Sequence, residues 1–160
     1  MIINLEPWEY VHASNVGIAR FAANWGKQDA PHYKKELMED DRTATVAAAI
    51  CELAVAKATN RFWSGHVWPK QEHQKYKDVP DVGRNIEVRR VRKGTTVAVR
   101  KHQLGKNLIL FAAYAEPPEF MTVDVWGWLN YDQAWELGEP APYAPDTTRL
   151  VNREHLITEW

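Results

Sequence analysis

The stretch DVGRNIEVR, residues 81–89, decides the fold, because it opens a run of strands after a helical segment. Residues 85–91 alternate between apolar and polar side chains, which is typical of a half-buried strand. Glu87 and Arg89 are two residues apart and therefore share one face of that strand. Asp81 precedes the strand in a turn-like segment. The stretch thus predicts a strand that carries an acidic and a positively charged residue on one side, with a second acidic residue just before it.

A helix is expected upstream, from Asp41 to about Asn60, with capping oxygens offered by Asp40, Asp41 and Thr43. Its small side chains would let it pack closely against a sheet. Glu52 is the one acid in its apolar run, residues 46–56. Burying an unpaired carboxylate costs on the order of several kcal/mol. Glu52 must therefore be exposed, hydrogen-bonded or bound to a metal ion.

The other expected elements complete a mixed α+β domain, in which helices come first and strands follow together. A first helix is expected from about Trp8 to Ala23, and a loop from Lys27 to Asp41. The expected strands are Thr95–Val99, Leu108–Ala115 and Met121–Leu129, followed by a short helix, Tyr131–Leu137, and an irregular tail from Gly138. Because Leu108–Ala115 is apolar throughout, it should be a central strand buried on both faces.

Length and composition indicate a single soluble globular domain, residues 1–160, with its core at about 41–137. The apolar share is 45% and the charged share 26%. Cys51 is the only cysteine, so a disulfide framework is excluded. The first residues lack the pattern of a secretory signal, and no apolar window is long enough for a membrane span. We therefore expect a cytoplasmic protein that does not contact a membrane.

The formal net charge of −1 hides a basic band, residues 84–106, which holds eight Lys and Arg against one acid, Glu87. Such a band can bind a phosphate backbone. Its candidate nucleic-acid contacts are Arg84, Arg90, Arg92, Lys93, Arg100 and Lys101. The alternative is that these cations are solvated strand residues balanced by the acidic residues 107–160. Both interpretations stay open.

The order of the acids resembles that of the PD-(D/E)xK nucleases. In that superfamily an acid on a helix precedes an Asp, a short gap and a Glu-hydrophobic-basic strand, as Glu52, Asp81 and Glu87-Val88-Arg89 do here. The resemblance covers about residues 44–129, and with 108–111, 125–128 and 149–156 the chain looks like small phage-encoded members. It implies a restriction-endonuclease-like core, a mixed sheet flanked by helices, that cleaves DNA with Mg²⁺ or Mn²⁺ in a bacterial host's cytoplasm.

Carried over to this chain, the resemblance implies that Asp81 and Glu87 hold the metal ion and that Glu52 completes its shell or orients a water. Arg89 occupies the family's lysine position. An arginine can contact a phosphate through two donors, but it stays protonated and cannot act as a base. Hydroxide would then come from the metal ion alone or from another base. Lys101, Lys106 and Arg90 stay open as migrated replacements of the family's lysine.

Two functions therefore remain: an active nuclease, or a catalytically inactive module of the same fold that binds nucleic acid or a host protein. A homodimer is also open, because dimers are common in this superfamily. Phosphate-binding glycine loops, serine-hydrolase elbows and zinc-ligand spacings are missing from the sequence. Four tryptophans, Trp63, Trp68, Trp126 and Trp128, are candidates for base stacking or for core packing. Trp126 and Trp128 are expected on one face of their strand.

Overall fold

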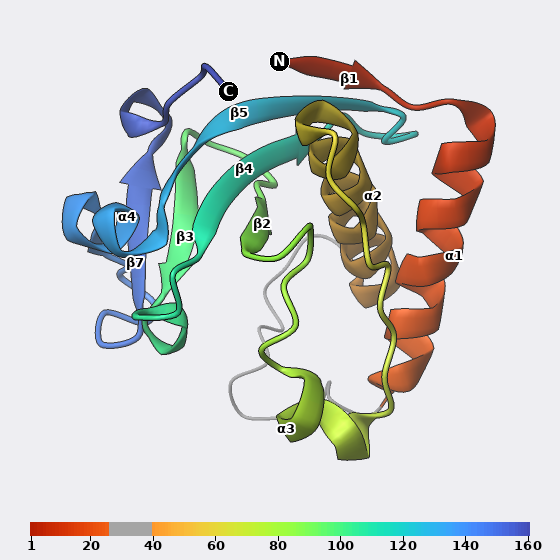
Figure 1. Ribbon diagram of the computed structural model, residues 1–160, viewed down its shortest axis with the longest axis horizontal. Coiled ribbons are helices and arrows are strands. Elements are labelled where there is room, and N and C mark those ends of the chain that lie inside the picture. Colours follow the sequence, from red (N-terminus) through yellow and green to blue (C-terminus); the bar gives the residue numbers. More distant parts are fainter. Residues whose placement is uncertain (26–39) are drawn as a thin grey trace.

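A computed structural model, which describes residues 1–25 and 40–160, shows a mixed α+β fold with two sheets (Figure 1). The larger sheet has the strand order β1 (Ile2–Asn4), β5 (Thr122–Asn130), β4 (Ile109–Ala115) and β2 (Ile86–Arg90). β4 is antiparallel to β5 and parallel to β2, so β2 forms an edge of the sheet. The α+β class predicted from the sequence is confirmed.

Two long helices cover one face of this sheet. α2 (Asp41–Thr59) packs directly on the sheet, and α1 (Pro7–Ala23) lies on the outer side of α2 (Figure 1). The Asp40 side chain accepts a hydrogen bond from the Thr43 backbone N–H at 2.7 Å, as the predicted cap requires. The helix ends at Asn60, which takes a left-handed conformation. Both predicted helices are confirmed.

The face of α1 that packs on α2 carries two small residues and one buried acid. Glu9, Ala13 and Gly17 are buried there. A Cβ on Gly17 would lie only 2.4 Å from the Cα of Val46, so the two helices can approach this closely only because glycine has no side chain. The large apolar residues that indicate the helix, among them Trp8, lie on its exposed side.

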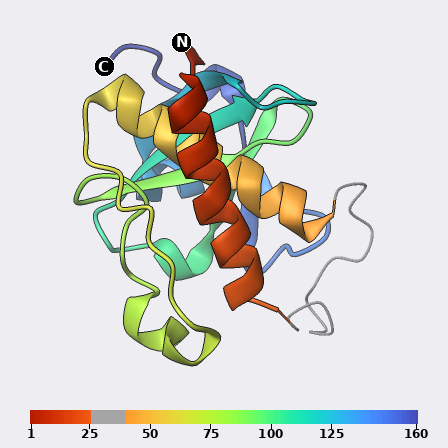
Figure 2. The same ribbon diagram turned by 90° about the vertical axis from the view of Figure 1, so that its right-hand side faces the viewer.

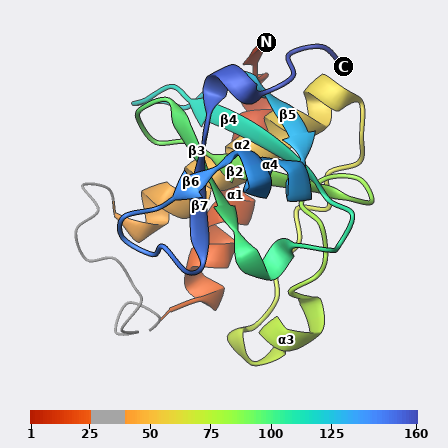
Figure 3. The same ribbon diagram turned by 90° about the vertical axis from the view of Figure 1, so that its left-hand side faces the viewer.

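The smaller sheet lies at the other end of the molecule, with the order β3 (Thr96–Arg100), β7 (Thr148–Asn152) and β6 (Glu139–Pro140) (Figure 3). α4 (Tyr131–Leu137) packs beside it. The remaining short elements are η2 (Lys70–Glu72), α3 (His73–Tyr76), η3 (Lys101–Gln103) and η4 (Arg153–His155). The irregular tail expected from Gly138 is therefore wrong, because β7 pairs along its whole length with β3.

β4 is buried on both faces, as predicted. Phe111 and Ala113 belong to a core between α2 and the larger sheet. Leu110 and Ala112 belong to a second core, which β3, β7 and α4 close from the other side. Two cores share this one strand, and its apolar run reflects that position.

Trp126 and Trp128 do not share a face of β5, contrary to the expectation. Trp126 belongs to the second core, whereas Trp128 packs against the first. The cause is a β-bulge: Ala112 pairs with Gly127, but the next residue of β4, Ala113, pairs with Val125. One extra residue in β5 reverses the alternation beyond it. Both tryptophans are thereby used in packing, and base stacking by them is not favoured.

The loop expected over Lys27–Asp41 falls, as far as residue 39, outside the described residues. Most other predicted boundaries agree with the structure to within one residue, whereas β1, β6, β7 and the short helical turns, α3 among them, had no counterpart in the prediction. In the described ranges, 1–25 and 40–160, no helix has the length and apolar character needed to cross a membrane.

Candidate active site

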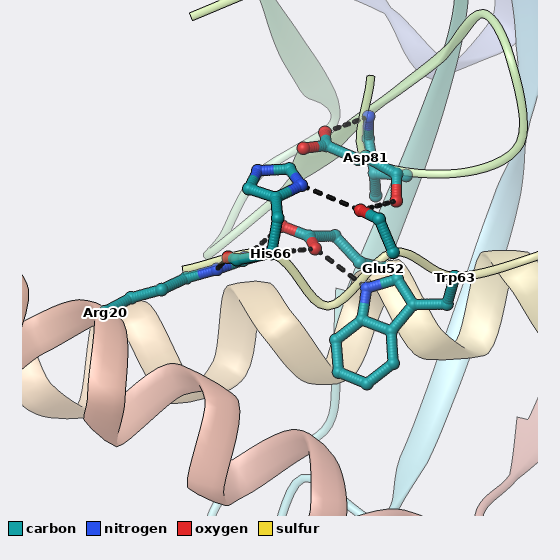
Figure 4. A network of polar contacts seen from close by, with 7 residues as sticks. Arg20, Glu52, Trp63, His66 and Asp81 are labelled. Atoms are coloured by element: carbon teal, nitrogen blue, oxygen red, sulfur yellow. Dashed lines mark hydrogen bonds and ion pairs between the residues drawn. The ribbon is translucent and has the colours of Figure 1, made fainter. Parts of the chain in front are cut away.

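Glu52 is buried in the middle of α2 and is fully engaged by polar partners (Figure 4). Arg20 of α1 donates two hydrogen bonds to it, from Nη1 to Oε1 at 2.6 Å and from Nη2 to Oε2 at 3.0 Å. Trp63 Nε1 donates to Oε2 at 2.9 Å. Of the three states that the sequence left open for Glu52, the structure shows the hydrogen-bonded one.

The same arginine links this pair to the segment that leads to Asp81. Arg20 Nε donates to the His66 carbonyl oxygen at 2.8 Å. The Ser64 hydroxyl lies 2.7 Å from His66 Nδ1 and donates to the Asp81 carbonyl oxygen at 3.4 Å (Figure 4). Burial, followed by the charge of Arg20, lowers the pKa of His66. The imidazole is thus kept neutral beside the acids.

Asp81 lies at the free edge of the larger sheet. Its Oδ2 accepts a hydrogen bond from the Val88 backbone N–H at 2.8 Å, which fixes the carboxyl group against β2. Burial raises the pKa of Asp81 well above its usual value, and the negative charges of Glu52 and Glu87 raise it further. The hydrogen bond from Val88 and the charge of Arg89 oppose this rise without cancelling it. Asp81 is therefore a buried acid in a surplus of negative charge.

Glu87 and Arg89 lie on one face of β2, as their spacing predicts. Glu87 Oε1 is 3.0 Å from Arg89 Nη2, and Gln103 Nε2 donates to the same oxygen at 3.3 Å. Burial raises the pKa of Glu87 in spite of the opposing charge of Arg89. Arg89 Nη2 also donates to the Tyr131 hydroxyl at 3.3 Å, and that hydroxyl accepts from the Arg100 backbone N–H at 2.9 Å.

The Arg89 guanidinium is held in its charged form by its surroundings. Burial disfavours that form, but Glu87, Tyr131 and Asp81 outweigh burial and raise the pKa of Arg89. Its Nε is buried and finds no hydrogen-bond acceptor in the part of the chain that the structure describes. An arginine with a raised pKa cannot serve as a base.

The three predicted acids gather around β2 but do not share one side of it. Val88 points toward α2 and packs in the core between that helix and the larger sheet. Glu52 is a buried residue of the same helix. Because strand side chains alternate, Glu87 points to the opposite face, with Asp81 at the edge between them. Among the described residues, no three His, Cys, Asp or Glu side chains are arranged to hold a metal ion. The three-acid metal site stays a prediction.

A polar cavity of about 340 Å³ opens beside Glu87. Gln103 and three cations, Lys77, Arg84 and Lys106, contribute to its walls. Lys106 Nζ donates to Gln103 Oε1 at 3.1 Å and is paired with Asp78. Since Gln103 bonds Glu87 in turn, Lys106 is connected to the buried acid through one side chain.

The predicted basic band is divided among separate places. Arg84 lines the cavity, whereas Arg90 is half-buried with its guanidinium 5.7 Å from the centre of the Phe120 ring. Arg92 and Lys93 lie in the turn before β3, and Arg100 and Lys101 lie at the other end of that strand. A five-residue strand separates these two pairs by roughly 15 Å. Binding of nucleic acid by these six residues stays a prediction.

The sequence predicted no role in the site for Arg20, Ser64, His66, Gln103 and Tyr131, and it gave Trp63 as a candidate for stacking or packing but not as a partner of Glu52. Arg20 had a detectable signal, because it follows Ala13 and Gly17 at helical spacing on the small-residue face of α1. The other four of these five residues carried none. Comparison of the chain with protein families, with curated proteins and with solved structures gave no match.

Proposed function

We propose that the protein is a metal-dependent nuclease that hydrolyses phosphodiester bonds of DNA, with Asp81 and Glu87 as ligands of Mg²⁺ or Mn²⁺. One observation carries this proposal: the carboxyl groups of Asp81 and Glu87 both lie at β2, one fixed by the Val88 N–H and the other beside Arg89, and burial raises the pKa of each while the charge of Glu87 raises that of Asp81 further. A hard divalent cation prefers carboxylate oxygens and would neutralise their surplus charge. A restriction-endonuclease-like core belongs to the same proposal and is supported by the acid-bearing helix beside β2.

The donor set fits such an ion in part. Asp81 and Glu87 are available as oxygen ligands, whereas Glu52 is already bound by Arg20 through two hydrogen bonds. Bound there, the ion would lower the pKa of a water and offset charge on the phosphate. Glu52 would then influence the ion only through its negative charge and would not bind it directly, unless its hydrogen bonds to Arg20 break.

The chain's own residues would position the substrate and accept the proton. Arg89, whose side chain is partly exposed, would donate from its guanidinium to a non-bridging phosphate oxygen. His66 is the best-placed base, because its lowered pKa keeps it neutral and Ser64 connects it to Asp81. Lys106 lines the cavity beside Glu87, and its amino group would contact phosphate there.

Cleavage of plasmid and of single-stranded DNA, with Mn²⁺ or with chelator, tests the proposal. The double variant Asp81→Asn/Glu87→Gln should lose at least about a hundredfold in rate. Asp146→Asn removes an exposed acid far along the chain and should cleave as the wild type does. Mn²⁺ binding measured by calorimetry should be lost in the same double variant. Undiminished cleavage by that variant would remove both acids from the mechanism.

A second function, an inactive nuclease-like module that binds nucleic acid or a host protein, is favoured by the engagement of Glu52 and by the arginine at position 89. Fluorescence anisotropy with labelled DNA distinguishes it from the first. Binding that chelator leaves unchanged, without cleavage under any divalent ion, would support the module. A steep loss of affinity with salt would assign the binding to phosphate contacts, and a flat response to a protein partner.

A further inference from the structure

α1 exposes a large apolar face on the side away from α2. Trp8 is 69% exposed, Val11 55% and Ile18 46%, and Trp25, just past the helix end, is 70% exposed. The opposite face is the one that Glu9, Ala13 and Gly17 bury. Figure 2 shows α1 at the front of the molecule, in front of α2. Exposed apolar residues gathered on one helix in this way mark an interaction surface.

The spacing of this face is that of a helix–helix seam. It consists of Trp8, Val11, Asn15, Ile18, Ala22 and Trp25, which follow one another at alternating intervals of three and four residues. This is the heptad pattern by which one helix packs along another. A polar Asn at one seam position is the usual device that fixes register. The ligand that fits this seam is therefore another helix.

The lack of charged residues on this face indicates which kind of helix would bind there. The exposed residues of α1 are Pro7, Trp8, Val11, His12, Asn15, Ile18, Ala19 and Ala22, and none is Lys, Arg, Asp or Glu. A two-fold axis places a surface against its own copy, so any net charge would meet the same charge. A neutral face avoids that repulsion and offers nothing to attract a partner of opposite charge.

We propose that a second copy of this chain docks on this seam, with the two α1 helices antiparallel about a two-fold axis. The axis passes between Asn15 and Ile18, so Val11 lies opposite Ala22 of the partner copy. Trp8 lies opposite Trp25 of the partner copy at each end. The four tryptophans, each about 150–250 Å² in area and partly exposed in the single chain, would supply about a third of a standard interface of ~1,600 Å².

Sedimentation velocity over a range of concentrations tests the association. The wild type should dimerise, and Val11→Glu/Ile18→Glu should weaken dimerisation at least about a hundredfold, because it buries like charges along the seam. Both residues are exposed, so the variant should keep the wild-type circular dichroism spectrum. Thr95→Glu, an equally exposed position in the turn before β3, should dimerise as the wild type does. A wild type that stays monomeric, or a charged variant that dimerises unchanged, overturns the proposal.

Oxidative cross-linking tests the antiparallel orientation. The variant Val11→Cys/Ala22→Cys should form a covalent dimer, since the two positions face each other across the axis. Val11→Cys alone should not, because the two copies of residue 11 would lie about 16 Å apart along the helices, beyond the ~4.4–6.8 Å between Cα atoms that a disulfide spans. Cys51 does not compete, because it is fully buried and burial raises its pKa to about 12. Cross-linking of the single variant, or none of the double variant, overturns the orientation.

Discussion

Replacement of Arg20 by alanine should destabilise the protein severely, because it leaves the carboxylate of Glu52 buried without its cationic partner. The side chains of this pair are only 15% and 8% exposed, so water cannot replace the lost partner. Breaking a buried ion pair by removing one member costs about 3–5 kcal/mol. Domains of this size are stable by about 5–15 kcal/mol. Arg20→Ala should therefore remove about a fifth or more of the free energy of unfolding.

Urea denaturation followed by tryptophan fluorescence measures this loss, and a double-mutant cycle assigns it to the pair. Arg20→Leu and Glu52→Leu should each be costly, whereas the double variant should cost less than the sum, because it leaves no buried charge unpaired. Asp78→Ala breaks a pair in which the acid side chain is 60% exposed, and it should leave the urea midpoint nearly unchanged, because water replaces the lost partner.

Two results would contradict this account. One is a loss of less than about 1 kcal/mol for Arg20→Ala, which would put the pair in the class of solvated surface bridges. The other is simple additivity of the two leucine variants, which would mean that Arg20 and Glu52 act independently.

Two further perturbations test other parts of the structure. The raised pKa of Asp81 means that the folded protein holds a proton over a pH range in which the unfolded chain has lost it, so this group makes stability fall as pH rises from about 4. Asp81→Asn should therefore match the wild type in urea unfolding at about pH 4 and exceed it at about pH 8, and parallel curves would refute the shift. Gly17→Ala should cost about 1–3 kcal/mol, since its Cβ would lie 2.4 Å from the Cα of Val46; an unchanged urea midpoint would mean that α1 and α2 separate there without cost.

The sequence predicted the elements that have strong local signals. α2 has a capping Asp40 and a long apolar run, and β4 is apolar throughout. β7 was placed in an irregular tail because that tail opens with Gly138-Glu-Pro-Ala-Pro, a run that favours loops. Its place in the fold comes from pairing with β3, which local pattern does not contain.

The packing direction of α1 was also beyond local pattern. The helix has two stripes, one of large apolar residues such as Trp8 and one of small residues such as Gly17. The small stripe was chosen because α2 is itself slim, with Ala47 and Ala49 buried along it, and two slim helices can approach closely. Only the partner element decides which stripe is inside.

The candidate site was predicted in part. The spacing of Glu87 and Arg89 placed them correctly on one strand face, and these two are bonded in the structure. Glu52 was recognised as needing a partner, but Arg20 lies 32 residues earlier in the chain and could not be matched to it. The order of acids along a chain also cannot show on which side of an edge strand each will point.

Because of the bulge in β5, the insertion or deletion of a residue should have a different effect in the middle of that strand than at its ends. Deletion of Trp126, the extra residue, would restore plain alternation and leave Trp128 and Leu129 opposite Phe111 and Leu110 as they are now, but it would take a large side chain out of the second core. The turn that joins β4 to β5 carries exposed residues and could lose one with far less harm. The length of that turn could therefore vary during evolution, while the extra residue of the bulge in β5 should be retained.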